Sequence, residues 1–130
     1  MGKKGSKAAS TNRGRAANNY ADSLVNLERF EEAKVLMRKT MPVARRVLRD
    51  GHRLALKIRW NYAKALWRDD GATLDDLREA VTTLEAAERT ARRVLGGAHP
   101  LTSAIEDDLQ HPRAALRARE TPSAPPPGSA

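Results

Sequence analysis

Apolar and small side chains recur at spacings of three and four residues along most of the chain, which is the pattern of helices with one buried face. The pattern predicts helices over residues 15–27, 30–48, 53–68 and 74–95, and a fifth helix that opens at His99-Pro100. Glu28-Arg29 is short enough for a tight connection between the first two. We therefore expect an all-α protein of five helices.

The third predicted helix is apolar on two sides. Two stripes run along it: Leu54, Ile58, Tyr62, Ala65 and Leu66 form one, and Leu56, Trp60, Ala63 and Trp67 form the other. A helix covered on two sides suits the interior of a stacked array.

Turn and cap residues mark the helix ends. Asp50-Gly51 and Gly96-Gly97 are predicted stops, because glycine adopts the left-handed conformation that closes a helix. Thr73, followed three residues later by Asp76, resembles an N-cap. Proline lacks an N–H, so Pro42 predicts a kink in the second helix and Pro112 a break or kink after Leu109 or Gln110.

Two segments of the sequence occur twice. Residues 91–95 repeat residues 44–48 as Ala-Arg-Arg-Val-Leu, and His99 stands to the later copy as His52 stands to the earlier one, at an offset of 47 residues. Asn61-Tyr62-Ala63 repeats Asn19-Tyr20-Ala21 at an offset of 42. Internal repeats of this length usually reflect stacked supersecondary units.

The charge of the chain is uneven. Of the net charge of +8, residues 1–15 carry five positive charges and no acid, whereas residues 16–130 carry 19 basic and 16 acidic side chains. We expect a basic disordered tail over residues 1–14, a helical domain over 15–119 and a second disordered tail, rich in Pro, Ser and Ala, over 120–130. A basic face on the domain itself is not predicted, which makes nucleic acid a less favoured partner.

Several classes of protein are not favoured by the composition. The chain has no cysteine, which excludes disulfides and thiolate metal sites. No apolar run approaches the ~18 residues of a membrane span, so we expect a soluble cytoplasmic protein.

His52, His99 and His111 are far apart, and the adjacent acid pairs suit helix caps or solvated faces. No phosphate loop, metal-ligand spacing or nucleophile motif is present, so we expect neither catalysis nor a cofactor.

These repeats resemble the tetratricopeptide repeat, and more narrowly its 42-residue kinesin-light-chain type. The matching motifs are Asn19-Tyr20-Ala21 and Asn61-Tyr62-Ala63, Phe30-Glu31-Glu32-Ala33, and the link Val94-Leu95-Gly96 through His99-Pro100 to Thr102. The first link lacks the Gly and Pro positions of that pattern. The resemblance implies antiparallel helix hairpins stacked as a short right-handed superhelix of about two and a half units.

In that family the first helix of each pair lines a concave groove that holds an extended peptide or a partner helix. The resemblance implies a groove formed by Asn19, Asp22, Asn26, Lys57, Trp60, Asn61, Lys64, Trp67 and Arg68. The amides of Asn19 and Asn61 suit a peptide backbone, or else satisfy neighbouring backbone groups. Trp60, Lys64 and Trp67 share one helix face, where we expect one Trp, Trp60 rather than Trp67, to be buried and the other to lie at the groove rim.

The expected function is therefore that of a non-catalytic scaffold or adaptor that binds a protein or peptide, favouring an acidic one. The alternative is an RNA- or anionic-surface-binding protein that uses the basic tail and the Lys and Arg residues of the third helix. Two and a half units are close to the ~3 needed for a self-supporting array, so self-association and membership of a longer array are both open.

Overall fold

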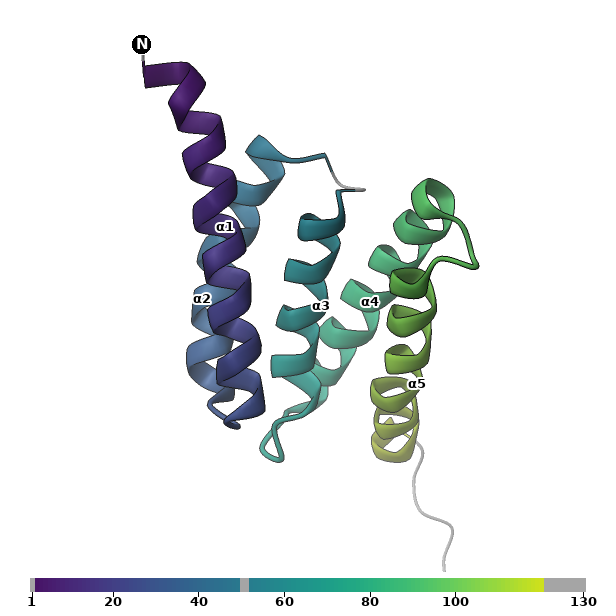
Figure 1. Cartoon of the computed structure of the whole chain (residues 1–130). Helices are drawn as coiled ribbons and strands as arrows, with labels where there is room; N and C mark the ends of the chain where they lie inside the picture. Colours follow the sequence, from purple (N-terminus) through teal and green to yellow (C-terminus); the bar gives the residue numbers. More distant parts are fainter. Residues whose placement is uncertain (1, 50–51, 121–130) are drawn as a thin grey trace, which may run out of the picture.

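The computed structural model describes residues 2–49 and 52–120, which form five helices (Figure 1). These are α1 Gly2–Asn26, α2 Phe30–Val47, α3 Arg53–Trp67, α4 Leu74–Leu95 and α5 Pro100–Glu120. Consecutive helices run in alternate directions and each packs against the next. No strand occurs over these two ranges, so the all-α prediction is confirmed.

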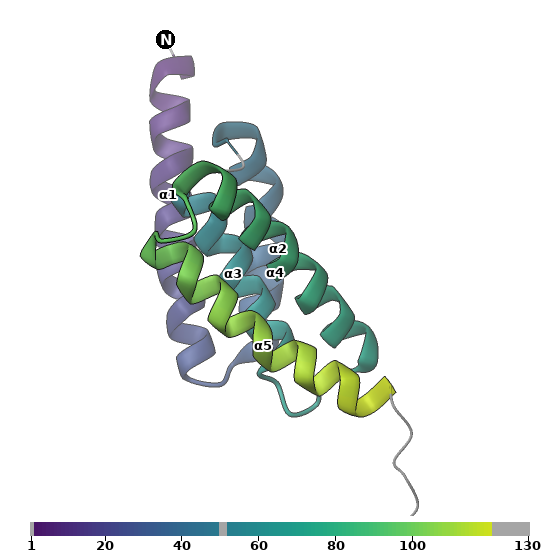
Figure 2. The same cartoon turned by 90° about the vertical axis from the view of Figure 1, so that its right-hand side faces the viewer.

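The helix α3 lies in the middle of the molecule. It packs against α1, α2 and α4, while the α1–α2 pair forms one end of the array and α5 the other (Figures 1 and 2). Leu56, Ala63 and Leu66 of α3 are fully buried, and they join one continuous core with Met37 of α2 and Leu84 of α4. The prediction that this helix is covered on two sides is confirmed.

The connection between α1 and α2 is tight because Glu28 takes the left-handed conformation, with φ of 61°. The backbone N–H of Arg29 donates to the carbonyl of Leu24 at 2.8 Å, and that of Glu28 to the carbonyl of Val25 at 3.0 Å. This pair of bonds closes the last turn of α1 in the arrangement that normally places glycine at the left-handed position.

The helix caps repeat where the sequence repeats. His52 and His99 each precede a helix, and their ring Nδ1 atoms accept the backbone N–H two residues later, from Leu54 at 3.1 Å and from Leu101 at 3.0 Å. The two histidines therefore satisfy equivalent amide groups at the starts of α3 and α5.

The start of α4 carries the predicted cap. The hydroxyl of Thr73 accepts from the backbone N–H of Asp76 at 3.1 Å, and the Asp76 carboxylate accepts from the backbone N–H of Thr73 at 3.0 Å. The hydrogen bond from the Thr73 backbone N–H to the carboxylate lowers the pKa of Asp76. The end of α4 at Gly96, with φ of 93°, is confirmed, whereas the predicted stop at Asp50-Gly51 lies outside the described residues.

The start of α1 differs from the sequence prediction. The helix α1 begins at Gly2 rather than near residue 15, and Ser10, Arg13 and Gly14 lie against the last turns of α2. The helix α2 continues through Pro42, in agreement with the single helix predicted over residues 30–48, and α5 continues through Pro112 to Glu120, so Pro112 does not break the helix. Pro112 is fully buried, so packing there offsets the missing hydrogen bond. Of the tail predicted over residues 120–130, Glu120 belongs to α5 and the rest lies outside the described residues.

The two left-handed positions predict opposite effects of glycine. Replacing Glu28 with Gly removes the steric cost of a side chain at φ of 61° and should raise the free energy of unfolding by about 1 kcal/mol. Replacing Gly96 with Ala introduces that cost and should lower it by about 1–2 kcal/mol, because the space around Gly96 is open and only the backbone is strained. Urea unfolding of both variants and of Glu28→Ala measures this; a Glu28→Ala variant as stable as Glu28→Gly would contradict the strain argument.

Candidate functional site

A hollow of about 230 Å³ lies between α1 and α3. The side chains that line it come from successive turns of each helix, since residues three and four apart share one helix face. They are Asn18, Asn19 and Asp22 of α1 and Lys57, Trp60, Asn61 and Lys64 of α3. Six of the nine residues named from the sequence line this hollow, whereas Asn26, Trp67 and Arg68 do not.

The Asn61 side chain is engaged inside the protein. Its amide nitrogen donates to the side-chain oxygen of Asn18 at 2.8 Å and lies 3.4 Å from the Asn18 carbonyl. Both residues are more than nine-tenths buried. This amide therefore ties α3 to α1 and satisfies a neighbouring chain segment, which is the second of the two roles considered for it. Asn18 belongs to the pair although its sequence context does not distinguish it from Asn19.

Lys64 lines the hollow and contacts two of the other lining residues. Its ammonium lies 4.4 Å from the centroid of the Trp60 ring and 3.7 Å from a carboxylate oxygen of Asp22. The ring face and the carboxylate are both attractive to a cation, and the side chain of Lys64 is only 16% exposed. Asp22 is the one acid among the seven lining residues. Lys64 already balances part of its charge.

The two tryptophan side chains contact residues of α5. The indole N–H groups of Trp60 and Trp67 both donate to one carboxylate oxygen of Asp108, at 2.9 and 3.3 Å. Trp67 also stacks on the ring of His111, with centroids 5.2 Å apart. Both tryptophans are half-buried, so the expectation of one buried Trp and one at the rim is wrong. The physical reason is that Asp108 and His111 of α5 reach these rings and cover part of each.

Asp108 and His111 are the residues that the sequence did not single out. The sequence predicts that Asp107-Asp108 is an acid pair on a solvated face. Nothing in the spacing indicates that only Asp108 of this pair points toward α3. Two indole donors seven residues apart, which need a buried acceptor, are the one signal that could have indicated it.

A smaller set of side chains is free to meet a ligand. Asn19, Asn26, Lys57 and Arg68 are exposed, and their side chains have no hydrogen-bond or ion-pair partner within residues 8–49 and 52–120. Of these, Asn19 and Lys57 line the hollow from opposite helices. The hollow therefore presents one free amide and one free cation above an occupied floor.

A second polar cluster lies between α2, α3 and α4. The Tyr62 hydroxyl donates to the Glu79 carboxylate at 2.5 Å and accepts from the Arg38 guanidinium at 3.2 Å. Burial raises the pKa of Tyr62, and the hydrogen bond to Glu79 raises it further, against a smaller lowering by Arg38. Arg38, Arg45 and Arg46 line a wider hollow of about 550 Å³ beside this cluster.

Comparison with models of known protein families, with curated proteins and with solved structures finds no match for the chain. Over residues 2–49 and 52–120, no helix is both long enough and apolar enough to cross a membrane. Within the same ranges, no three His, Asp or Glu side chains come together as metal ligands.

Because Asp108 accepts from both indoles, substitutions at Asp108 and at its neighbour Asp107 should affect stability unequally. Asp108→Ala leaves two half-buried indole N–H groups without a partner and should lower the free energy of unfolding by about 2 kcal/mol, with a shift in tryptophan emission. Asp107→Ala removes the same charge from the exposed neighbouring position and should change stability by less than ~0.5 kcal/mol. Equal losses in the two variants would show that α5 is held by charge alone.

The Tyr62 cluster predicts a stability change at alkaline pH. Because the pKa of Tyr62 is raised on folding, its contribution is fully present below the unfolded value of about 10 and is lost as pH rises through the folded value. At neutral pH, Tyr62→Phe should cost about 1 kcal/mol, since Glu79 remains solvated. Unfolding measured from pH ~8 to ~11 should therefore show the two proteins converging as pH rises. A constant gap would contradict this linkage.

Proposed function

We propose that this protein is a non-catalytic binding module that holds an extended, acidic peptide in the hollow between α1 and α3. The observation that carries the proposal is the pairing of Asn19 and Lys57, which are exposed, unpartnered and on opposite walls of that hollow. Beneath them the Asn18–Asn61 pair and the Lys64–Trp60 contact provide a fixed floor. A rigid, prearranged site loses less conformational entropy on binding.

We further infer that the helices stack in the manner of tetratricopeptide repeats, as a short right-handed superhelix. In support, the repeated segments fall at equivalent places, because residues 44–48 end α2 and residues 91–95 end α4. His52 and His99 then cap the next helix through the same bond. In such an array α1 and α3 are the first helices of successive hairpins, which are the ones expected to line a peptide groove.

The charges of the hollow favour an acidic ligand. Two lysines and one aspartate line it, and Asp22 is already close to Lys64. Lys57 is therefore left to pair with a carboxylate of the ligand, through a charge-assisted hydrogen bond. Asn19 can donate to and accept from one peptide unit of the ligand backbone, which fixes the peptide direction without selecting its sequence.

The second candidate is binding to RNA or another anionic surface. The observation that favours it is the hollow between α2, α3 and α4, where three arginines face a single acid that already accepts from Tyr62. Arg45 and Arg46 have no hydrogen-bond or ion-pair partner among the described residues. Guanidinium groups bind phosphates in a bidentate manner, so this surface suits a phosphate backbone better than a peptide.

Titration with a library of acidic peptides, followed by tryptophan fluorescence, tests the proposal. Trp60 reports binding because it lies in the wall of the hollow. Lys57→Gln should weaken binding about tenfold, the loss of one charge-assisted hydrogen bond, and Asn19→Ala should weaken it a few-fold. Arg89→Gln makes the same change of net charge at an exposed position of α4 and should bind as the unmodified protein does.

Two outcomes would contradict the peptide groove. Equal weakening by Lys57→Gln and Arg89→Gln would mean that binding follows net charge and not the hollow. Absence of a saturable peptide signal, together with RNA binding whose logarithm falls with log salt at a slope near −2, would favour the arginine surface, because about three phosphates would be neutralised.

A further inference from the structure

Exposed apolar side chains gather on the α1–α2 hairpin. Five large apolar residues are strongly exposed among the described ones, and four belong to this hairpin. They are Tyr20 at 55%, Leu27 at 67%, Val35 at 42% and Val43 at 37%, and the fifth is Val94 of α4 at 52%. The hairpin forms one end of the array, with α3 beside it on one side only (Figure 1). Its outward face is therefore an apolar surface without a covering element.

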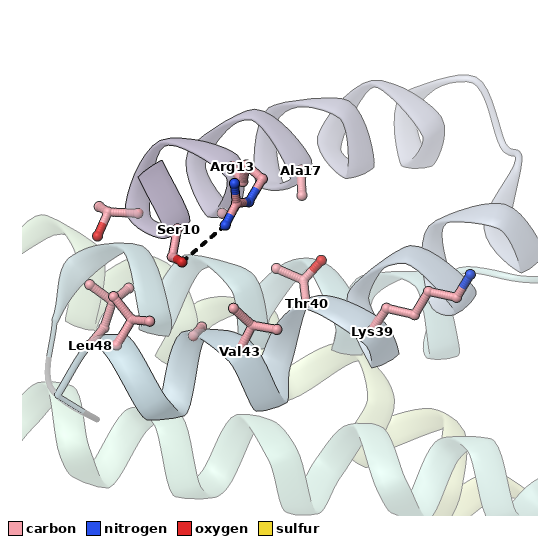
Figure 3. Close-up of a pocket in the computed structure, with 11 residues that line it drawn as sticks. Ser10, Arg13, Ala17, Lys39, Thr40, Val43 and Leu48 are labelled. Carbon is pink, nitrogen blue, oxygen red and sulfur yellow. Dashed lines mark hydrogen bonds between the residues drawn. The ribbon is translucent and has the colours of Figure 1, made fainter. Parts of the chain in front are cut away.

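This face is hollow at one end and bulky at the other. We call it the outward seam, formed by residues 10, 13, 14, 17 and 20 of α1 and residues 35, 39, 43 and 47 of α2. A cleft of about 180 Å³ opens between the helices where Gly14 and Ala17 face Val43 and Val47, as Figure 3 shows around Ala17, Thr40 and Val43. Towards the connection between the helices, the seam instead presents the large side chains of Tyr20 and Val35.

The charges of the seam also differ between its ends. The bulky end carries Glu32, which is paired with Arg29, and Glu31, which lies 2.9 Å from the buried Lys34 but is 74% exposed; the hollow end carries Arg13. Lys39 lies between the two and borders both hollows. A second copy turned by 180° about an axis through the middle of the seam would place large side chains over the cleft and the acidic end against the basic end.

The opposite end of the molecule does not offer the same kind of surface. The exposed side chains of α5 include Asp107, Gln110, His111 and Arg117. Head-to-tail stacking of α5 on the seam would place polar groups over the apolar cleft, whereas seam-on-seam contact covers apolar surface in both copies. The occupant of the seam is therefore a second seam.

We propose that the outward seam is the interface of a two-fold symmetric dimer of this chain. Residues that meet across such an interface do so reciprocally, so each copy contributes one bulky end and one hollow end. The cleft is of the size that takes one aromatic ring, since apolar cavities of about 150 Å³ bind benzene. Tyr20 of each copy fills the cleft of the other, and the ammonium of Lys39 reaches solvent beside the axis.

The size of the seam indicates a weak dimer. The 18 residues of α2 extend about 27 Å, and two packed helices are about 20 Å wide, so each copy contributes an area of about 500 Å². This is at the lower limit of specific interfaces. We expect dissociation constants on the order of 10–100 μM, which leaves the groove between α1 and α3 open in both copies.

Sedimentation equilibrium of the full chain over about 5–500 μM tests the proposal. The unmodified protein should fit a monomer–dimer equilibrium. Val43→Glu places a charge in the cleft and should weaken the dimer at least tenfold. Val94→Glu is the matched control, because Val94 is an exposed valine of α4 outside the seam, and it should leave the equilibrium unchanged. Far-ultraviolet circular dichroism establishes that both variants remain folded.

A second measurement locates the axis. The chain has no cysteine, so Lys39→Cys introduces a single thiol beside the proposed two-fold axis, where it should form a disulfide between copies under mild oxidation. Val94→Cys should not. A protein that stays monomeric over the whole concentration range, that forms a ladder of larger species, or whose dimer survives Val43→Glu would overturn the proposal.

Discussion

The fold depends on covering α3 from two sides. Its two apolar stripes cannot both face one neighbour, so the chain supplies a helical hairpin against one side and α4 with α5 against the other. Burying an apolar side chain of this size stabilises a protein by about 1.5–3 kcal/mol, and α3 buries several of them completely. The positions of the remaining helices follow from the need to cover the apolar surface of α3.

Two polar contacts determine how the neighbours sit on this helix. Asn61 reaches Asn18 on α1, and the indoles of Trp60 and Trp67 reach Asp108 on α5. Apolar packing is not directional, whereas an unpaired polar group in the interior is costly, so these contacts select one arrangement among many that would bury similar area. The Asn18–Asn61 pair also forms part of the floor of the hollow, beneath the exposed side chains of Asn19 and Lys57.

The two ends of the molecule carry different surfaces. At one end α5 turns charged side chains outward, and its inner face satisfies the tryptophans. At the other end the α1–α2 hairpin keeps Tyr20 and Val43 exposed around an apolar cleft. A stack of helices needs a polar outer face at each end to remain monomeric, and the α1–α2 end is the more apolar of the two.

The sequence by itself determined the five helices, the two-sided character of α3 and the Thr73–Asp76 cap, because these follow from local periodicity and hydrogen bonds between near neighbours. It also placed Asn19, Lys57 and Lys64 on the faces that line one hollow. Only the tertiary structure decided that α1 begins at Gly2, that Pro112 stays inside a helix and that Asp108 meets both tryptophans. The Asp108 contact depends on how α5 is rotated against α3, which no local spacing specifies.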